Sequence, residues 1–198
     1  MLTTDFRRTL KLYWPRWSML ATGAVLACTL LPVSQELIRL LEGWFFPKLP
    51  EGAAKLLEAL HDPTLSIWLP LFAFAVAPAI CEELAFRGFI LSGIQRTGRP
   101  WLPIVLSSVA FGVIHMIPQQ VFNATLLGLV LGLLAVRSGS LLPGVLFHFI
   151  FNGAQVVMSR IDPTRWSTAS AGGCLPSSTR GTGPCCDSTG RWSRSAPE

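Results

Sequence analysis

Five ionisable side chains interrupt the apolar stretches that make up most of residues 63–158. They are Glu82, Glu83, Arg87, His115 and His148. A charged side chain at the centre of a bilayer costs roughly 2.5–3.5 kcal/mol on insertion scales, whereas each Leu, Ile or Phe returns only about 0.3–0.6 kcal/mol. Ionisable residues in such segments therefore mark candidate functional sites.

The spacing of these groups suits the hydrolysis of an amide. Glu83 and Arg87 are four residues apart with Glu first, the better order for an ion pair on a helix, and Glu82 is turned about 100° away from Glu83. His148 and Asn152 are also four residues apart, on one helical face. A carboxylate and an imidazole can position and deprotonate a water, while a second imidazole and a carboxamide can hold an oxyanion.

A zinc site is an alternative use of nearly the same atoms. Two histidines and a carboxylate, with water in the fourth position, form a plausible catalytic zinc set, which here would be Glu82, His115 and His148. Taken one at a time, these residues could also have purely structural roles. Either histidine alone could join two helices by a hydrogen bond, and Glu83 with Arg87 could be a structural ion pair. The occurrence of all these polar groups in the same apolar stretches favours a functional site.

The composition indicates an integral membrane protein whose first partner is the lipid bilayer. Of 198 residues, 51% are hydrophobic and 14% charged, against about 25% charged in soluble domains. The net charge of +5 arises from bases in short segments between apolar runs. The sequence contains no basic stripe with interleaved aromatic residues, so it does not indicate a nucleic-acid partner.

The expected fold class is all-α, an integral membrane helical bundle of about five transmembrane helices with a disordered C-terminal tail. The expected spans are 17–33, 66–94, 101–117, 121–136 and 141–158. Residues 1–62 would comprise an interfacial segment, the first span and an amphipathic linker from residue 34 onward. Residues 63–158 would form the transmembrane core, and residues 159–198 the tail, which is rich in Ser, Thr, Gly and Pro.

Charge and length predict how these helices sit together. Bases precede the first span and occupy the loops near residues 96–99 and 137, so the positive-inside rule places the N-terminus in the cytoplasm. At about 1.5 Å per residue, Glu82, His115, His148 and Asn152 fall at similar depth, and one bundle could gather them. Gly128-x-x-x-Gly132 predicts a seam where another helix approaches closely.

Three ordered motifs carry a resemblance to a known family. The motifs are Glu82-Glu83-x-x-x-Arg87, Phe111-Gly112-x-x-His115 and His148-Phe149-x-x-Asn152. Together they resemble the signature of the CAAX prenyl protease and bacteriocin-processing family (CPBP, or Abi) of intramembrane proteases, over about residues 65–158. The resemblance implies that Glu82 and His115 activate water and that Glu83 and Arg87 support the site. It also implies an oxyanion hole of His148 and Asn152.

The resemblance implies an endopeptidase of a bacterial inner (cytoplasmic) membrane that cleaves a peptide or membrane-protein substrate. A permease or a second copy of the chain is a further expected partner. Because the sequence has no H-E-x-x-H, a glutamate mechanism is favoured and Zn²⁺ stays the alternative. Five spans are fewer than in the eukaryotic prenyl-protein enzymes, so no prenyl-binding surface is implied. The competing hypotheses are a non-catalytic membrane module, such as a bacteriocin-immunity or permease-associated subunit, and a small transporter.

Overall fold

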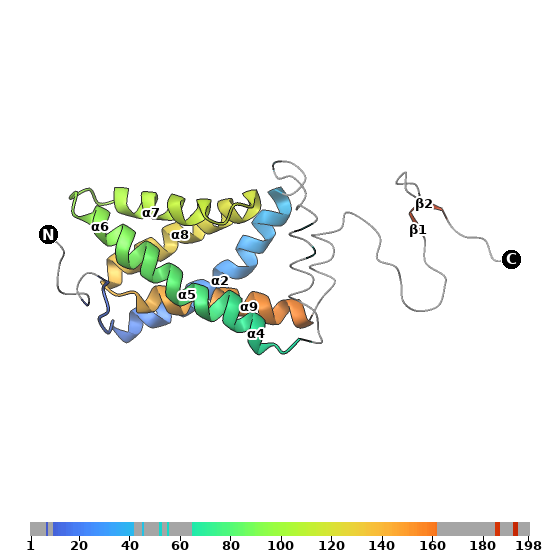
Figure 1. Ribbon diagram of the computed structural model, residues 1–198, viewed down its shortest axis with the longest axis horizontal. Helices are drawn as coiled ribbons and strands as arrows, with labels where there is room; N and C mark the ends of the chain where they lie inside the picture. The colour runs from blue at the N-terminus through green and yellow to red at the C-terminus, as the bar shows by residue number, and fades with distance from the viewer. Residues whose placement is uncertain are drawn as a thin grey trace.

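The computed structural model consists of apolar helices (Figure 1). It describes residues 10–41, 65–161, 185–186 and 192–193 and the single positions 7, 45, 52 and 55. The four separate α-helices are α2 (Trp17–Leu41), α7 (Leu102–Val113), α8 (Pro118–Ser138) and α9 (Leu142–Ile161). A further long helix is segmented into α4 (Trp68–Leu71), η1 (Phe72–Val76), α5 (Ala77–Glu82), η2 (Glu83–Leu91) and α6 (Ser92–Gln95), where η1 and η2 are π-helical. The all-helical prediction for the membrane part is confirmed.

Two short strands lie near the end of the chain. The strands β1 (Cys185–Cys186) and β2 (Trp192–Ser193) pair in antiparallel fashion. The rest of the predicted disordered tail, from residue 162 onward, lies outside the described residues.

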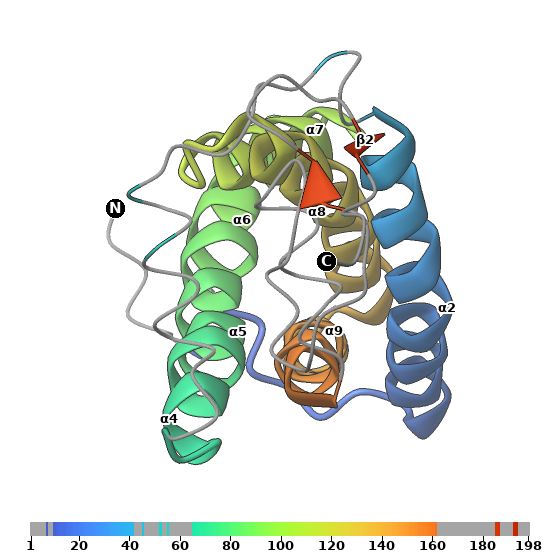
Figure 2. The same ribbon diagram turned by 90° about the vertical axis from the view of Figure 1, so that its right-hand side faces the viewer.

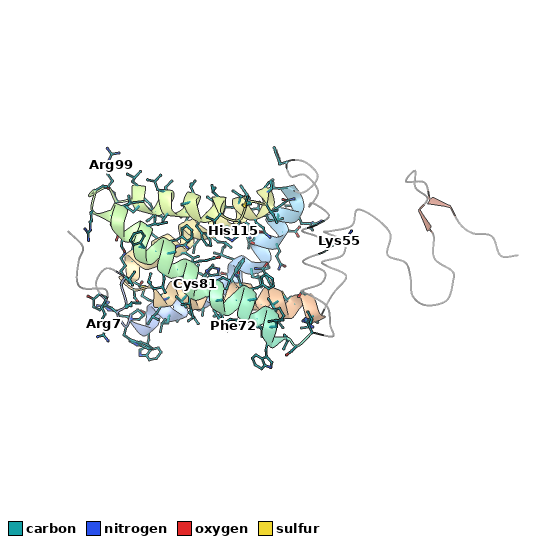
Figure 3. All side chains as sticks on the ribbon, in the orientation of Figure 1. Arg7, Lys55, Phe72, Cys81, Arg99 and His115 are labelled. Carbon is teal, nitrogen blue, oxygen red and sulfur yellow. The ribbon has the colours of Figure 1, made fainter. Side chains whose placement is uncertain are left out.

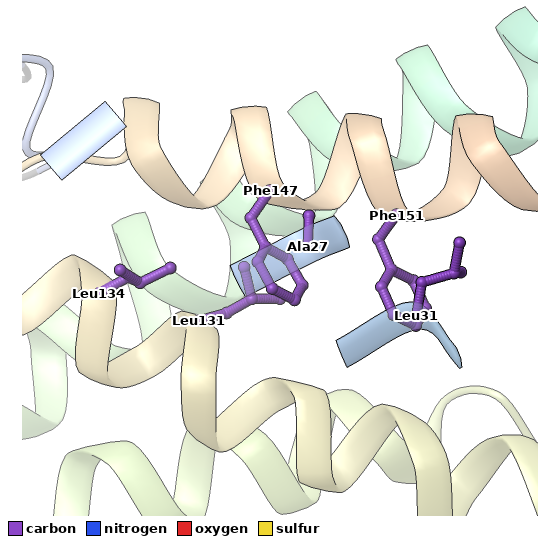
Figure 4. Packing of buried hydrophobic residues seen from close by; sticks show 6 residues of the cluster. All are labelled: Ala27, Leu31, Leu131, Leu134, Phe147 and Phe151. Atoms are coloured by element: carbon purple, nitrogen blue, oxygen red, sulfur yellow. The ribbon is translucent and has the colours of Figure 1, made fainter. Parts of the chain in front are cut away.

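The helices surround the centre of the bundle (Figure 2). The segmented helix and α2 lie on opposite sides, with α9 between them at one edge and α7 and α8 at the other. α7 packs along α8, and α9 packs against both α2 and η1. A hydrophobic cluster joins α2, α8 and α9 (Figure 4) through Ala27, Leu31, Leu131, Leu134, Phe147 and Phe151.

Among the residues that the structure describes, four helices are long and apolar enough to cross a membrane: 17–41, 68–95, 118–138 and 142–161. Large apolar side chains such as Trp68, Phe72 and Phe89 are exposed on their surfaces, as expected where a helix faces lipid. α7, the third predicted span, has 12 residues and is about 18 Å long, which is shorter than the hydrocarbon core.

The early end of α7 has a local cause. Met116 has a φ of 59°, and Ile117 is extended with φ −90° and ψ 122°. Ile117 precedes Pro118, whose ring disfavours the helical conformation in the residue before it. The helix therefore stops at Val113, and His115 lies in the turn between α7 and α8 instead of inside a span.

Three helices are longer than predicted, among them α8, which covers Pro118–Ser138 instead of 121–136. α2 continues to Leu41, so residues 34–41 extend the first span instead of forming an interfacial segment. In this extension Ser34 Oγ donates to Asn123 Oδ1 of α8 at 2.9 Å, and Arg39 pairs with Glu36. α9 continues to Ile161, past the predicted end at Met158. Most of the predicted amphipathic linker, residues 42–64, lies outside the described residues.

The N-terminal segment closes one end of the bundle. Lys11 O accepts a hydrogen bond from Leu141 N at 3.2 Å, and Ser140 Oγ donates to Tyr13 O at 2.5 Å. Figure 3 shows Arg7 and Arg99 at this same end and Lys55 at the other. The loop after α6 and the loop between α8 and α9 also lie at this end.

Candidate active site

A buried ion pair begins the π-helical segment η2. Glu83 and Arg87 are fully buried, and Arg87 Nη1 lies 2.9 Å from Glu83 Oε1. Arg87 Nη2 donates to Gly128 O of α8 at 3.3 Å. Burying two charges is favourable only when their geometry and extra hydrogen bonds offset the loss of water. The ion pair predicted from the spacing is present, and it is anchored to a second helix.

His148 of α9 lies between the two adjacent carboxylates. Its Nε2 is 3.6 Å from Glu82 Oε2, and its Nδ1 is 3.5 Å from Glu83 Oε1. Each ring nitrogen therefore lies close to a carboxylate oxygen of a different glutamate. With Arg87, the cluster brings together two carboxylates, an imidazole and a guanidinium. Such groups are costly in an apolar bundle unless they are paired.

The two carboxylates differ in their surroundings. The side chain of Glu83 is 0% exposed and is bound to Arg87, whereas that of Glu82 is 25% exposed. Within the described residues, Glu82 Oε2, Glu83 Oε2 and His148 Nδ1 are buried and make no hydrogen bond. Each glutamate therefore has one oxygen without a hydrogen-bond partner, but only Glu83 is bound to Arg87, through Oε1, and only Glu82 is partly exposed.

Close approach of α9 to the carboxylates depends on Gly144. A Cβ at position 144 would lie 2.8 Å from Glu83 Oε2, closer than a carbon and an oxygen normally come. Gly144 is one helical turn before His148, so the absence of a side chain lets the same face of α9 bring the imidazole to Glu82 and Glu83.

His115 is joined to the site through Phe111. His115 Nδ1 lies 2.9 Å from Phe111 O, and because a carbonyl oxygen only accepts, Nδ1 carries the proton and Nε2 is left as an acceptor. The rings of Phe111 and His115 are in edge contact, with centroids 5.1 Å apart. Among the described residues His115 makes no ion pair with a carboxylate, so His148 is the histidine that contacts Glu82 and Glu83.

Asn152 ties α9 to the segmented helix just before the carboxylates. Its Nδ2 donates to Phe74 O at 2.9 Å. The residue four positions after Phe74 is Pro78, which has no N–H to donate in an α-helical bond. Asn152 thus supplies the donor that the proline lacks, and it stabilises the turn that leads into Glu82.

We expect a double-mutant cycle to show this link. Asn152→Ala should lower the free energy of unfolding by about 1–3 kcal/mol, the usual cost of a buried polar group left unpaired. In a Pro78→Ala background the loss should be smaller, because the restored N–H can donate to Phe74 O. Denaturant titration in detergent micelles measures both losses. An equal loss in the two backgrounds would contradict the link.

The sequence comparisons agree with this geometry. Residues 64–154 match the model of the family described as Rce1-like, type II CAAX prenyl endopeptidase. Residues 64–154, less than half of the chain, are therefore similar to the Rce1-like family. The match spans the segmented helix, α7, α8 and the part of α9 that bears His148 and Asn152. Searches of curated proteins and of solved structures found no match to the chain.

Similarity to the Rce1-like family suggests a coarse function. At the family level the match indicates a CAAX-protease-like membrane endopeptidase, a hydrolase. Together with the four helices that could cross a membrane, it makes the chain an integral membrane protein.

The predicted zinc ligands lie only partly together. Glu82 and His148 are in contact, whereas His115 contacts Phe111. In the described ranges, no group of three or more His, Cys, Asp or Glu side chains is placed to hold a metal ion. This arrangement does not fit a zinc ion bound by all three residues, and zinc stays a prediction for metal analysis to test.

Three residues of the candidate active site were not identified from the sequence as site residues: Phe111, Gly128 and Gly144. Gly128 belongs to the predicted small-residue seam, and a Cβ there would lie 3.0 Å from Ser108 of α7. That close packing is the predicted role of the seam, but Gly128 also accepts the hydrogen bond from Arg87. A glycine in a helix leaves its carbonyl oxygen open to a buried donor. The glycine in an apolar span was therefore the signal in the sequence that could have identified this position.

Proposed function

We propose that this chain is an intramembrane endopeptidase that cleaves a peptide bond with a water activated by Glu82. The proposal rests on the different surroundings of two adjacent carboxylates. Arg87 neutralises Glu83, while Glu82 is partly exposed and faces His148. A partly open carboxylate beside an imidazole inside an apolar bundle is suited to proton transfer without bulk water.

In the proposed reaction, Glu82 takes up one proton and later gives it away. The carboxylate takes a proton from water as the water oxygen bonds to the scissile carbonyl carbon, which gives a tetrahedral oxyanion. When that intermediate collapses, the C–N bond breaks and Glu82 passes its proton to the leaving amine. The products are a carboxylic acid and an amine, and Glu82 returns to its starting state.

The other polar residues have supporting roles in this proposal. His148 donates an N–H to the developing oxyanion, and the second N–H of the Asn152 amide, beyond the one bonded to Phe74 O, is the second donor. His115 offers Nε2 as an acceptor that orients the attacking water, because its Nδ1 proton is held by Phe111 O. Glu83 and Arg87 keep the carboxylate pair in place.

The substrate we propose is a peptide or a segment of a membrane protein. The membrane is the inner (cytoplasmic) membrane of a bacterium, with the N-terminus in the cytoplasm. The gathering of Arg7, Arg99 and the neighbouring loops at one end of the bundle supports this orientation. A permease or a second copy of the chain is the proposed protein partner.

Purified protein in detergent is expected to cleave members of a quenched fluorescent peptide library. Cleavage should continue after thorough chelation, because the proposed base is a carboxylate and not a metal-bound water. Loss of cleavage on chelation with recovery on Zn²⁺ would favour the zinc mechanism. If the folded wild-type protein cleaves no peptide or membrane-protein substrate, and His115→Ala and His148→Ala leave its partner binding unchanged, a non-catalytic module becomes the better description.

A further inference from the structure

We infer that Phe111 is a positioning residue of this site, whose ring holds Arg87 and both histidines in their working arrangement. The functional part of this inference rests on the proposed peptidase activity. The structural part concerns only how four side chains are held together, and it can be tested whether or not the chain cleaves peptides.

One face of the Phe111 ring is covered by Arg87. The guanidinium carbon Cζ lies 4.3 Å from the ring centroid, well inside the distance at which a cation is attracted by an aromatic ring. The contact is fully desolvated, since Arg87 is completely buried and Phe111 is 3% exposed. Arg87 is thus fixed by three partners: Glu83, Gly128 O and the ring.

The same ring touches both histidines. Its centroid is 5.1 Å from that of His115, with an interplanar angle of 77°, and 5.9 Å from that of His148, with an angle of 87°. Such nearly perpendicular contacts are favourable arrangements of aromatic rings. Phe111 thus contacts both imidazoles and links the position of one to that of the other.

The backbone around Phe111 is held tightly in place. A Cβ at Gly112 would overlap Thr125 Oγ1 of α8, so α7 and α8 approach closely just beside the ring. The carbonyl of Phe111 also accepts the Nδ1 proton of His115. Ring and carbonyl of one residue therefore fix the location of His115 and which of its nitrogens is free.

The test compares Phe111→Leu with Phe151→Leu. Both positions are buried aromatic residues, but Phe151 packs against Leu31 and Phe147 in the hydrophobic cluster (Figure 4) and is not part of the ring contacts described above. We expect Phe111→Leu to lower kcat about tenfold with KM changed less than twofold, beyond any effect of Phe151→Leu. The two variants should lose similar thermal stability.

A spectroscopic measurement makes the inference independent of activity. The chain has three histidines, so selectively labelled protein in micelles gives three imidazole signals that single His→Gln variants assign. Phe111→Leu should shift the signals of His115 and His148 together, because both lose the ring current of Phe111, while Phe151→Leu should shift neither comparably.

The outcomes separate the two proposals. Shifted histidine signals in a protein without peptidase activity would support the ring contacts and overturn the proposed function. An active enzyme in which both Leu variants have equal kcat, or in which the two histidine signals do not move, would overturn the role of Phe111. If Phe111→Leu does not fold, incorporation of 3,4,5-trifluorophenylalanine at position 111 keeps the shape and weakens the attraction for Arg87. It should still lower kcat, and unchanged kcat and histidine signals would count against the inference.

Discussion

Glu82→Gln is expected to reduce the rate of peptide cleavage by about 10²–10⁴-fold, the usual contribution of a general base. The amide has the size of the carboxylate but cannot take a proton from water. Because the Glu82 side chain is partly exposed and is not a partner of Arg87, the fold should be kept. Steady-state cleavage of a quenched peptide, with unfolding followed in parallel, measures both effects.

The matched control for this prediction is Glu36→Gln. Glu36 lies on α2, where it forms an exposed ion pair with Arg39, and removing such a pair changes little. Cleavage by the control should match that of the wild type. Residual activity of Glu82→Gln within tenfold of wild type would show that another group takes the proton, and Glu83→Gln would then identify it.

Arg87→Met is expected to be the most destabilising single substitution at the site. It leaves Glu83 as a buried carboxylate without its partner, which typically costs 3–5 kcal/mol. It also removes the contacts to Gly128 O and to the Phe111 ring. The measurement is the free energy of unfolding in mixed micelles, together with the yield of folded protein.

The double variant Glu83→Gln, Arg87→Met should recover much of that stability, because no uncompensated charge remains in the bundle. Arg39→Met is the control for the loss of an arginine from an ion pair, since Arg39 and Glu36 are exposed, and it should have little effect. If Arg87→Met is as stable as Arg39→Met, or if the double variant is no better than the single one, the buried pair does not hold the site together.

Helical periodicity explains how much of the site could be predicted. The Glu83–Arg87 pair follows from a four-residue spacing within one helix, and the structure contains it. The small-residue seam at Gly128 and Gly132 also follows from one helix, and α7 packs there through Ser108 and Ile104. These features depend on residue type and local spacing, which the chain carries without reference to any other element.

Contacts between helices required the tertiary structure. Similar depth along separate helices suggested that Glu82, His115, His148 and Asn152 could meet. Depth does not determine which side of each helix faces the centre of the bundle. In the structure, Gly144 lets α9 turn His148 onto Glu82 and Glu83, while the break before Pro118 moves His115 into a turn. Asn152 bonds the carbonyl that Pro78 leaves without an α-helical donor.

The sequence by itself determined which polar groups interrupt the apolar stretches, their order along the chain and the ion pair that one helix can form. Only the tertiary structure decided that His148 is the histidine between the carboxylates and that Phe111 links it to His115. The physical reason is that spacing within a helix is fixed by its hydrogen bonds. Which side of a helix packs against its neighbour depends on where small side chains allow close approach and where prolines interrupt the helix.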